Sequence, residues 1–145
     1  GAVRGAVPPF LARGPAEVVI ANRTVATAQV LAREFGARGT VTPCGYADLA
    51  DERGFELVLN GTSASLKTEL PPVPAGVFTN AALAYDMVYG KGLTPFLRLA
   101  RDAGVPRLAD GVGMLVEQAA EAFAWWRGVR PDTRAVIDQL TVPLA

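Results

Sequence analysis

Short apolar runs alternate with amphipathic stretches along the whole chain. Residues 18–21 form an apolar run rich in β-branched side chains, typical of a buried parallel strand, and residues 25–35 follow with a helical pattern. Further strands are predicted at 40–42, 55–59, 82–88 and 107–109, and further helices at 95–104, 114–126 and 132–140. Strands that alternate with helices predict an α/β fold with a doubly wound parallel sheet.

The first eleven residues predict another helix, which opens with the glycine-rich sequence Gly1-Ala2-Val3-Arg4-Gly5. We expect Pro8 and Pro9 to distort the middle of this helix. Because no strand precedes it, we expect the chain to begin after the first strand of its sheet. The residues expected to face that sheet are Ala2, Ala6, Phe10 and Leu11.

Polar residues follow two of the predicted strands. At the end of the second strand of a dinucleotide-binding sheet, an acid hydrogen-bonds a ribose 2′-hydroxyl, whereas an arginine accommodates a 2′-phosphate. This chain has Asn22, Arg23 and Thr24 there and no acid, which favours NADP over NAD. A helix N-cap at Thr24 beside a solvated arginine explains the same residues equally well. Small polar residues at 60–63 indicate either a ligand-binding edge or an ordinary turn.

Composition excludes several classes of function. The 14 basic and 14 acidic residues balance and are scattered, which argues against a nucleic-acid or membrane partner. The single cysteine, Cys44, permits no internal disulfide and suits a reducing cytoplasm. The absence of histidine excludes Ser-His-Asp and Cys-His catalysis and disfavours a zinc site.

Five groups of residues recur in an order found in one enzyme family. They are Ala21-Asn22-Arg23-Thr24, Asn60-x-Thr62-Ser63, residues 85–97 with Tyr85-Asp86-Met87-Val88-Tyr89-Gly90-Lys91 and Thr94-Pro95-Phe96-Leu97, residues 110–120 with Asp110-Gly111-x-Gly113-Met114, and Trp126-Arg127-Gly128. Together they resemble shikimate dehydrogenase, specifically its carboxyl-terminal half. The resemblance covers essentially the whole chain and implies a Rossmann-like sheet.

This resemblance implies an NADP-dependent oxidoreductase that interconverts 3-dehydroshikimate and shikimate in chorismate and aromatic amino acid biosynthesis. By resemblance, Tyr89 and Gln118 hydrogen-bond shikimate. The cofactor-binding positions that it implies are Gly1 and Ala2 at the phosphate turn, Asn22, Arg23, Thr24 and Thr27 at the ribose, and Met87, Gly111 and Met114 near the nicotinamide.

The resemblance also implies that two parts of the chain have different roles. Residues 1–110 are expected to bind NADP, and residues 111–145 to return as helices to a substrate domain. The family's catalytic lysine and aspartate belong to an amino-terminal domain, so we expect no catalytic residue in this chain; Lys67 and Lys91 match no such motif. Without that domain, an apolar helix face is expected to be exposed or paired with another molecule. Its residues are Leu115, Phe123, Trp125 and Trp126.

One departure from the family affects cofactor choice. Thr27 and Ala28 stand where the family usually has a second basic residue, so recognition of the 2′-phosphate rests on Arg23 alone. Alternatives stay open: a quinate/shikimate dehydrogenase, a non-catalytic module that binds a dinucleotide, or an interaction domain. The complete protein is expected to be a monomer or a homodimer.

Overall fold

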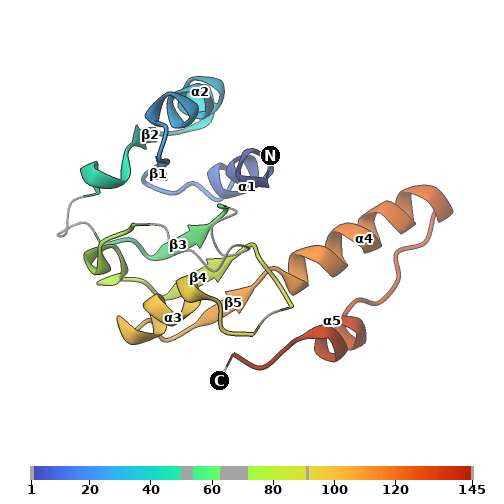
Figure 1. Cartoon of the computed structure of the whole chain (residues 1–145). Coiled ribbons are helices and arrows are strands. Elements are labelled where there is room, and N and C mark those ends of the chain that lie inside the picture. Colours follow the sequence, from blue (N-terminus) through green and yellow to red (C-terminus); the bar gives the residue numbers. More distant parts are fainter. Residues whose placement is uncertain (1, 50–53, 63–71, 91, 145) are drawn as a thin grey trace. The chain divides into compact units, whose positions relative to one another are not determined.

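A computed structural model describes residues 2–49, 54–62, 72–90 and 92–144 (Figure 1). The strands are β1 (Val18–Ala21), β2 (Val41–Cys44), β3 (Leu57–Asn60), β4 (Leu83–Asp86) and β5 (Leu108–Asp110). The α-helices are α1 (Ala2–Leu11), α2 (Val25–Phe35), α3 (Pro95–Asp102), α4 (Val112–Arg127) and α5 (Arg134–Leu140). Short 3₁₀ turns are η1 (Gly36–Arg38), η2 (Tyr46–Asp48) and η4 (Ala75–Phe78).

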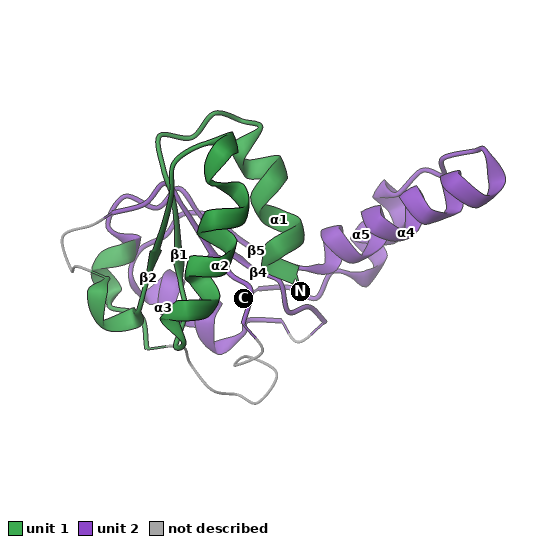
Figure 2. Cartoon of the chain, turned by 90° about the horizontal axis from the view of Figure 1, so that it is seen from above, with its two compact units in different colours: residues 1–53, 72–77 green, residues 54–71, 78–145 purple. Residues whose placement is uncertain are grey.

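The chain forms two compact units, coloured separately in Figure 2. Unit 1 comprises residues 1–53 and 72–77, and its strands β1 and β2 pair in parallel. Unit 2 comprises residues 54–71 and 78–145, and its parallel sheet has the order β3-β4-β5. The predicted alternation of parallel strands and flanking helices is therefore confirmed, with the described strands in two sheets.

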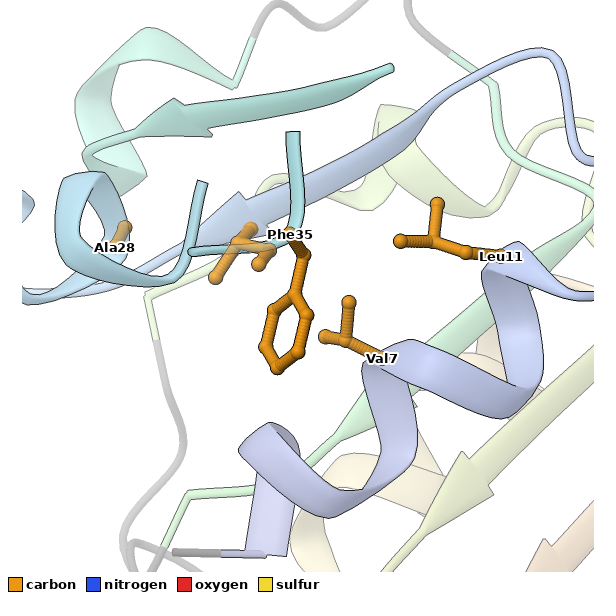
Figure 3. Close-up of a cluster of buried hydrophobic side chains, with 5 residues drawn as sticks. Val7, Leu11, Ala28 and Phe35 are labelled. Atoms are coloured by element: carbon orange, nitrogen blue, oxygen red, sulfur yellow. The ribbon is translucent and has the colours of Figure 1, made fainter. Parts of the chain in front are cut away.

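Unit 1 is held together by an apolar cluster between its two helices and β1 (Figure 3). Phe35 at the end of α2 is 6% exposed, and Ala28, about two turns earlier on the same helix, is fully buried. Burying apolar surface of this kind is the main force that holds helices on a sheet. The cluster consists of Val7, Leu11, Ile20, Ala28 and Phe35.

The buried face of α1 corrects the prediction from sequence. Leu11 is buried as predicted, and so is Val7, which was not predicted. The predicted Ala2 is exposed, and Ala6 and Phe10 are only partly buried. Val3 packs against the same cluster, so the face runs through every fourth residue from Val3. Valine and leucine bury more apolar area than the alanines at positions 2 and 6, which favours this rotation of the helix, while Phe10 keeps part of its burial. Pro8 and Pro9 lie inside α1, which continues through them to residue 11.

Unit 2 has its core between the sheet and α3. Phe96 and Leu97 of α3 are 2% and 0% exposed, and Ala84 of β4 is fully buried. The rings of Phe78 and Phe96 are 5.8 Å apart and tilted by 55°, a favourable aromatic arrangement. As predicted, α3 begins with a capping threonine and a proline: the Thr94 hydroxyl accepts from the backbone N–H of Leu97 at 3.2 Å.

The buried residues of helix α4 all lie before residue 121. Val112, Val116 and Ala120 form its buried face, while Phe123, Trp125 and Trp126 are 46%, 88% and 73% exposed. In Figure 1, α4 extends from β5 and α5 runs back beside it. The helix ends at Gly128, whose φ of 71° is left-handed.

Arg130 holds the connection between α4 and α5. Its guanidinium forms ion pairs with Glu117 and Glu121, which are one turn apart on α4. The Thr133 hydroxyl also donates to Glu117, at 2.7 Å. None of the helices in the described part of the chain is long and apolar enough to cross a membrane.

Candidate functional site

Three polar residues stand side by side at the carboxyl edge of the unit 2 sheet. Asn60, Asp86 and Asp110 are the last residues of β3, β4 and β5, and the register pairs Asn60 with Asp86 and Asp86 with Asp110. Ligands of open parallel sheets bind at this edge. The side chains here organise the loops that leave the strands.

Asp86 is the centre of a buried hydrogen-bond network. One carboxylate oxygen accepts from the Asn60 side-chain amide and from the backbone N–H of Val88, both at 3.1 Å. The other accepts from the Thr94 hydroxyl at 2.6 Å. The carboxylate is fully buried, so these donors compensate the cost of removing it from water. The network joins the ends of β3 and β4 to the start of α3.

A second set of contacts fixes the turn after β4 against the start of α4. Asp110 accepts from the backbone N–H of Val112 at 3.1 Å and, through a long hydrogen bond of 3.4 Å, from that of Gly90. A Cβ on Gly111 would lie 2.3 Å from the backbone oxygen of Met87 and 3.2 Å from Cδ1 of Tyr89. Only glycine allows this approach. Three of the predicted site residues, Met87, Tyr89 and Gly111, therefore lie together.

Tyr85 connects β4 to the same helix. Burial raises the pKa of Tyr85 above its usual value of 10.0, the negative charge of Asp110 adds to the rise, and a backbone hydrogen bond with Met114 opposes it. The phenol therefore lies beside the first turn of α4 and keeps its proton at neutral pH.

Met114 and Gln118 lie one turn apart on α4, on one face. Each is two positions from the buried Val116, so both side chains project from the side roughly opposite to it, about 200° around the helix. Met114 is partly buried, and Gln118 is exposed. Both are therefore accessible to a ligand at this end of unit 2.

The corresponding edge of unit 1 carries the predicted ribose-binding residues. The Asn22 side-chain oxygen accepts from the backbone N–H of Thr24 at 3.2 Å. Thr24 occupies the N-cap position of α2, but its hydroxyl makes no capping hydrogen bond. Arg23 is exposed, and no hydrogen bond or ion pair joins it to another described residue. The edge thus presents an exposed hydroxyl and an exposed cation. The missing capping bond counts against a plain N-cap at Thr24, whereas the exposure of Arg23 agrees equally with a solvated side chain.

The remaining ribose-end positions differ in their surroundings. Thr27 is exposed on the first turn of α2, whereas Ala28 is fully buried in the unit 1 core. A basic side chain could therefore reach solvent from position 27 and not from position 28. Ala2 is exposed at the start of α1, and Gly1, Ser63, Lys67 and Lys91 lie outside the described residues.

The motifs contain Asp86 and Asp110 but do not predict that these two carboxylates hold the loops of the site in place. A usable signal was present, because an Asx residue stands at or just after the end of β1, β3, β4 and β5. Such side chains commonly hydrogen-bond the backbone two residues further on. Asn22, Asn60, Asp86 and Asp110 all do so.

The sequence of this chain is similar to those of known proteins. Residues 111–141 match the family model described as "Shikimate 5'-dehydrogenase C-terminal domain". The NADP(+) shikimate dehydrogenase of Nitrosospira multiformis is 56% identical over 140 residues, which cover 97% of this chain and 50% of that protein. The chain is similar to the carboxyl-terminal half of shikimate dehydrogenase. A second NADP(+) shikimate dehydrogenase, from Chromobacterium violaceum, is 54% identical over 145 residues, which are 100% of this chain and 53% of that one.

Solved structures agree with the sequence matches. An Ael1 enzyme from Pseudomonas putida is 63% identical, with a TM-score of 0.91 over 99% of this chain and 52% of that one. The shikimate 5-dehydrogenase of Thermus thermophilus, solved with NADP(H) and shikimate, is 33% identical, with a TM-score of 0.70 over 87% of this chain and 45% of that one. The chain thus spans about half the length of the shikimate dehydrogenases and solved structures it matches. The Rossmann-like fold is confirmed.

Proposed function

We propose that this chain supplies NADP binding and part of the shikimate pocket in an NADP-dependent shikimate dehydrogenase. The observation that carries the proposal is Arg23: an exposed guanidinium follows β1 in a chain 56% identical to a protein of that name. Arginine suits a phosphate because it is always charged and donates several hydrogen bonds in one plane. The shikimate dehydrogenase matches favour shikimate over quinate.

Each edge would bind one part of the reactants. Asn22, Arg23 and Thr24 would hold the ribose 2′-phosphate, with Thr27 beside them and Gly1 and Ala2 at the pyrophosphate. The unit 2 edge would receive the nicotinamide at Met87, Gly111 and Met114. Tyr89 and Gln118 would donate or accept hydrogen bonds with shikimate hydroxyls.

The residues present fit a nicotinamide cofactor. The backbone of Met87, in the turn after β4, packs closely against Gly111. This turn is therefore in position before any ligand binds. NADP, when bound, supplies or accepts the hydride. The Asp86 and Asp110 networks would orient this turn and the start of α4.

Proton transfer would be assigned to groups outside this chain. Reduction of a ketone also needs a proton donor at the carbonyl oxygen. The chain has no histidine, and resemblance places the catalytic lysine and aspartate in an amino-terminal domain. We accordingly propose that residues 1–110 bind NADP and that residues 111–145 contribute to the substrate domain, in a cytoplasmic enzyme.

The test is an enzyme made by joining this chain to the half of the Nitrosospira multiformis relative that it does not match, called here the joined enzyme. We expect shikimate-dependent formation of NADPH that saturates with both substrates and is slower with NAD. Activity with quinate at a similar kcat/KM would favour a quinate/shikimate dehydrogenase. Tight NADP binding without turnover would favour a binding module.

A further inference from the structure

Tyr46 follows β2 at the carboxyl edge of unit 1, near enough to Arg23 for the charge of the arginine to act on its phenol. Ala21 of β1 pairs with Cys44 of β2, and the backbone N–H of Asn22 donates to the Cys44 carbonyl at 3.1 Å. The parallel ladder thus continues one residue past β1. The loops that begin at Asn22 and Gly45 consequently leave the sheet as neighbours.

The loop that carries Tyr46 is fixed against the start of α2. A Cβ on Gly45 would lie 3.2 Å from Cγ2 of Val25, the first residue of that helix. The Gly45 N–H donates to the Asp48 carboxylate at 2.9 Å, and the Leu49 N–H donates to the Tyr46 carbonyl at 3.3 Å. Tyr46 therefore projects from a closed turn rather than from an open loop.

The Tyr46 hydroxyl is an available donor near a cation. Burial raises the pKa of Tyr46 above 10.0, and the positive charge of Arg23 lowers it in part, so the phenol keeps its proton at neutral pH. Tyr46 is partly buried, and its hydroxyl forms no hydrogen bond with another described residue. Positions 27 and 28 supply no second basic group at this edge.

We propose that the Tyr46 hydroxyl is a second specificity-determining group for the 2′-phosphate of NADP, donating a hydrogen bond to the phosphate oxygens that Arg23 binds. This inference rests on the proposed function, because it assumes that the unit 1 edge receives the adenosine end of NADP. It explains how one arginine suffices: a neutral donor stands on the neighbouring loop, while Thr27 and Ala28 occupy the positions where a second basic residue is usual.

The experiment measures binding of adenosine 2′,5′-bisphosphate and AMP to the joined enzyme by titration calorimetry. These probes differ only in the 2′-phosphate. We expect Tyr46→Phe to weaken binding of the bisphosphate by about 10- to 150-fold, as for loss of one hydrogen bond to a charged acceptor. Binding of AMP should change less than about twofold, because the aromatic ring is retained.

Two controls separate the possible failures. Tyr89→Phe removes the same atom at the edge of unit 2 and should leave the ratio of the two affinities unchanged; Arg23→Ala should reduce it. If Tyr46→Phe weakens both probes equally, or neither, while Arg23→Ala still lowers the ratio, the role of Tyr46 is overturned and NADP binding stands. If the unsubstituted enzyme binds both probes equally, the proposed cofactor preference itself fails.

Discussion

Arg23 is an exposed cation with no carboxylate bound to it in the described part of the chain. Its proposed contact exists only with a cofactor that has a 2′-phosphate. Arg23→Ala should therefore weaken NADP binding by about 1.5–3 kcal/mol, the value of a charge-assisted hydrogen bond, and leave NAD binding nearly unchanged. Titration of both cofactors into the joined enzyme measures the difference. Equal losses would show that Arg23 does not contact the 2′-phosphate.

Gly111 is constrained by space rather than by charge. An alanine Cβ there would lie 2.3 Å from the Met87 carbonyl oxygen, so backbone must move. We expect Gly111→Ala to lower the free energy of unfolding by about 1–3 kcal/mol, as overpacking does. Gly113→Ala is the matched control, because a Cβ at Gly113 meets nothing within 4 Å.

Alanine at position 113 of α4 should be neutral or stabilise by up to about 1 kcal/mol, since it restricts the unfolded chain. Urea denaturation of both variants gives the comparison. Similar effects of the two substitutions would mean that the Gly111–Met87 approach is not a constraint in solution.

At the scale of elements, α3 and α2 begin with threonines that act differently. The Thr94 hydroxyl caps α3 and donates to the buried Asp86 carboxylate, whereas the Thr24 hydroxyl makes no capping bond. We expect Thr94→Ala to destabilise by about 2–4 kcal/mol, combining a lost cap with a lost bond to a buried charge. Thr24→Ala should cost less than about 0.5 kcal/mol.

The shift of the urea midpoint measures this contrast, and Thr94→Ser should recover most of the loss because serine retains the hydroxyl. A small effect of Thr94→Ala would mean that other donors replace the hydroxyl at Asp86. Besides lowering stability, Thr94→Ala would loosen the turn that carries Met87 and Tyr89, since Asp86 also accepts from the backbone N–H of Val88.

At the scale of the whole molecule, Gln118 distinguishes a substrate site from a cofactor sensor. It is exposed one turn beyond Met114 on α4. In the joined enzyme, Gln118→Ala should raise KM for shikimate by the equivalent of about 0.5–1.5 kcal/mol, one neutral hydrogen bond, and leave NADP affinity nearly unchanged. If neither quantity moves, Gln118 is a surface residue without a role in binding.

The chain by itself should not oxidise shikimate above background. It has no histidine, and resemblance assigns proton transfer to a lysine and an aspartate of the family's amino-terminal domain. Steady-state NADPH formation by residues 1–145, with the joined enzyme as the positive control, measures this. Saturable activity of the chain alone would contradict the proposal that proton transfer comes from groups outside it, and Lys67 and Lys91 would be the first candidates to test.

Sequence motifs predicted some residues of the candidate site, but not the contacts that hold the site together. The motifs around Arg23 and Gly111 identified positions that the structure places at strand ends, with Gly111 against Met87 and Tyr89. Neither the Asp86 network nor the proximity of Tyr46 to Arg23 could be predicted in this way. The hydrogen bond between Asn60 and Asp86 joins residues 26 apart in sequence, and no local pattern specifies such a pair.

The sequence by itself determined the order of strands and helices, because their periods and capping residues are local properties. It predicted α2 at its observed bounds and the start of α3 at Thr94-Pro95. Leu11 was predicted to be buried on α1, but only the tertiary structure decided that Val7 shares its face rather than Ala2, Ala6 and Phe10, since Val7 is selected by its contacts with the cluster around Phe35. The tertiary structure also decided that position 111 must be glycine, because a Cβ there would collide with the backbone of Met87 in the turn after β4.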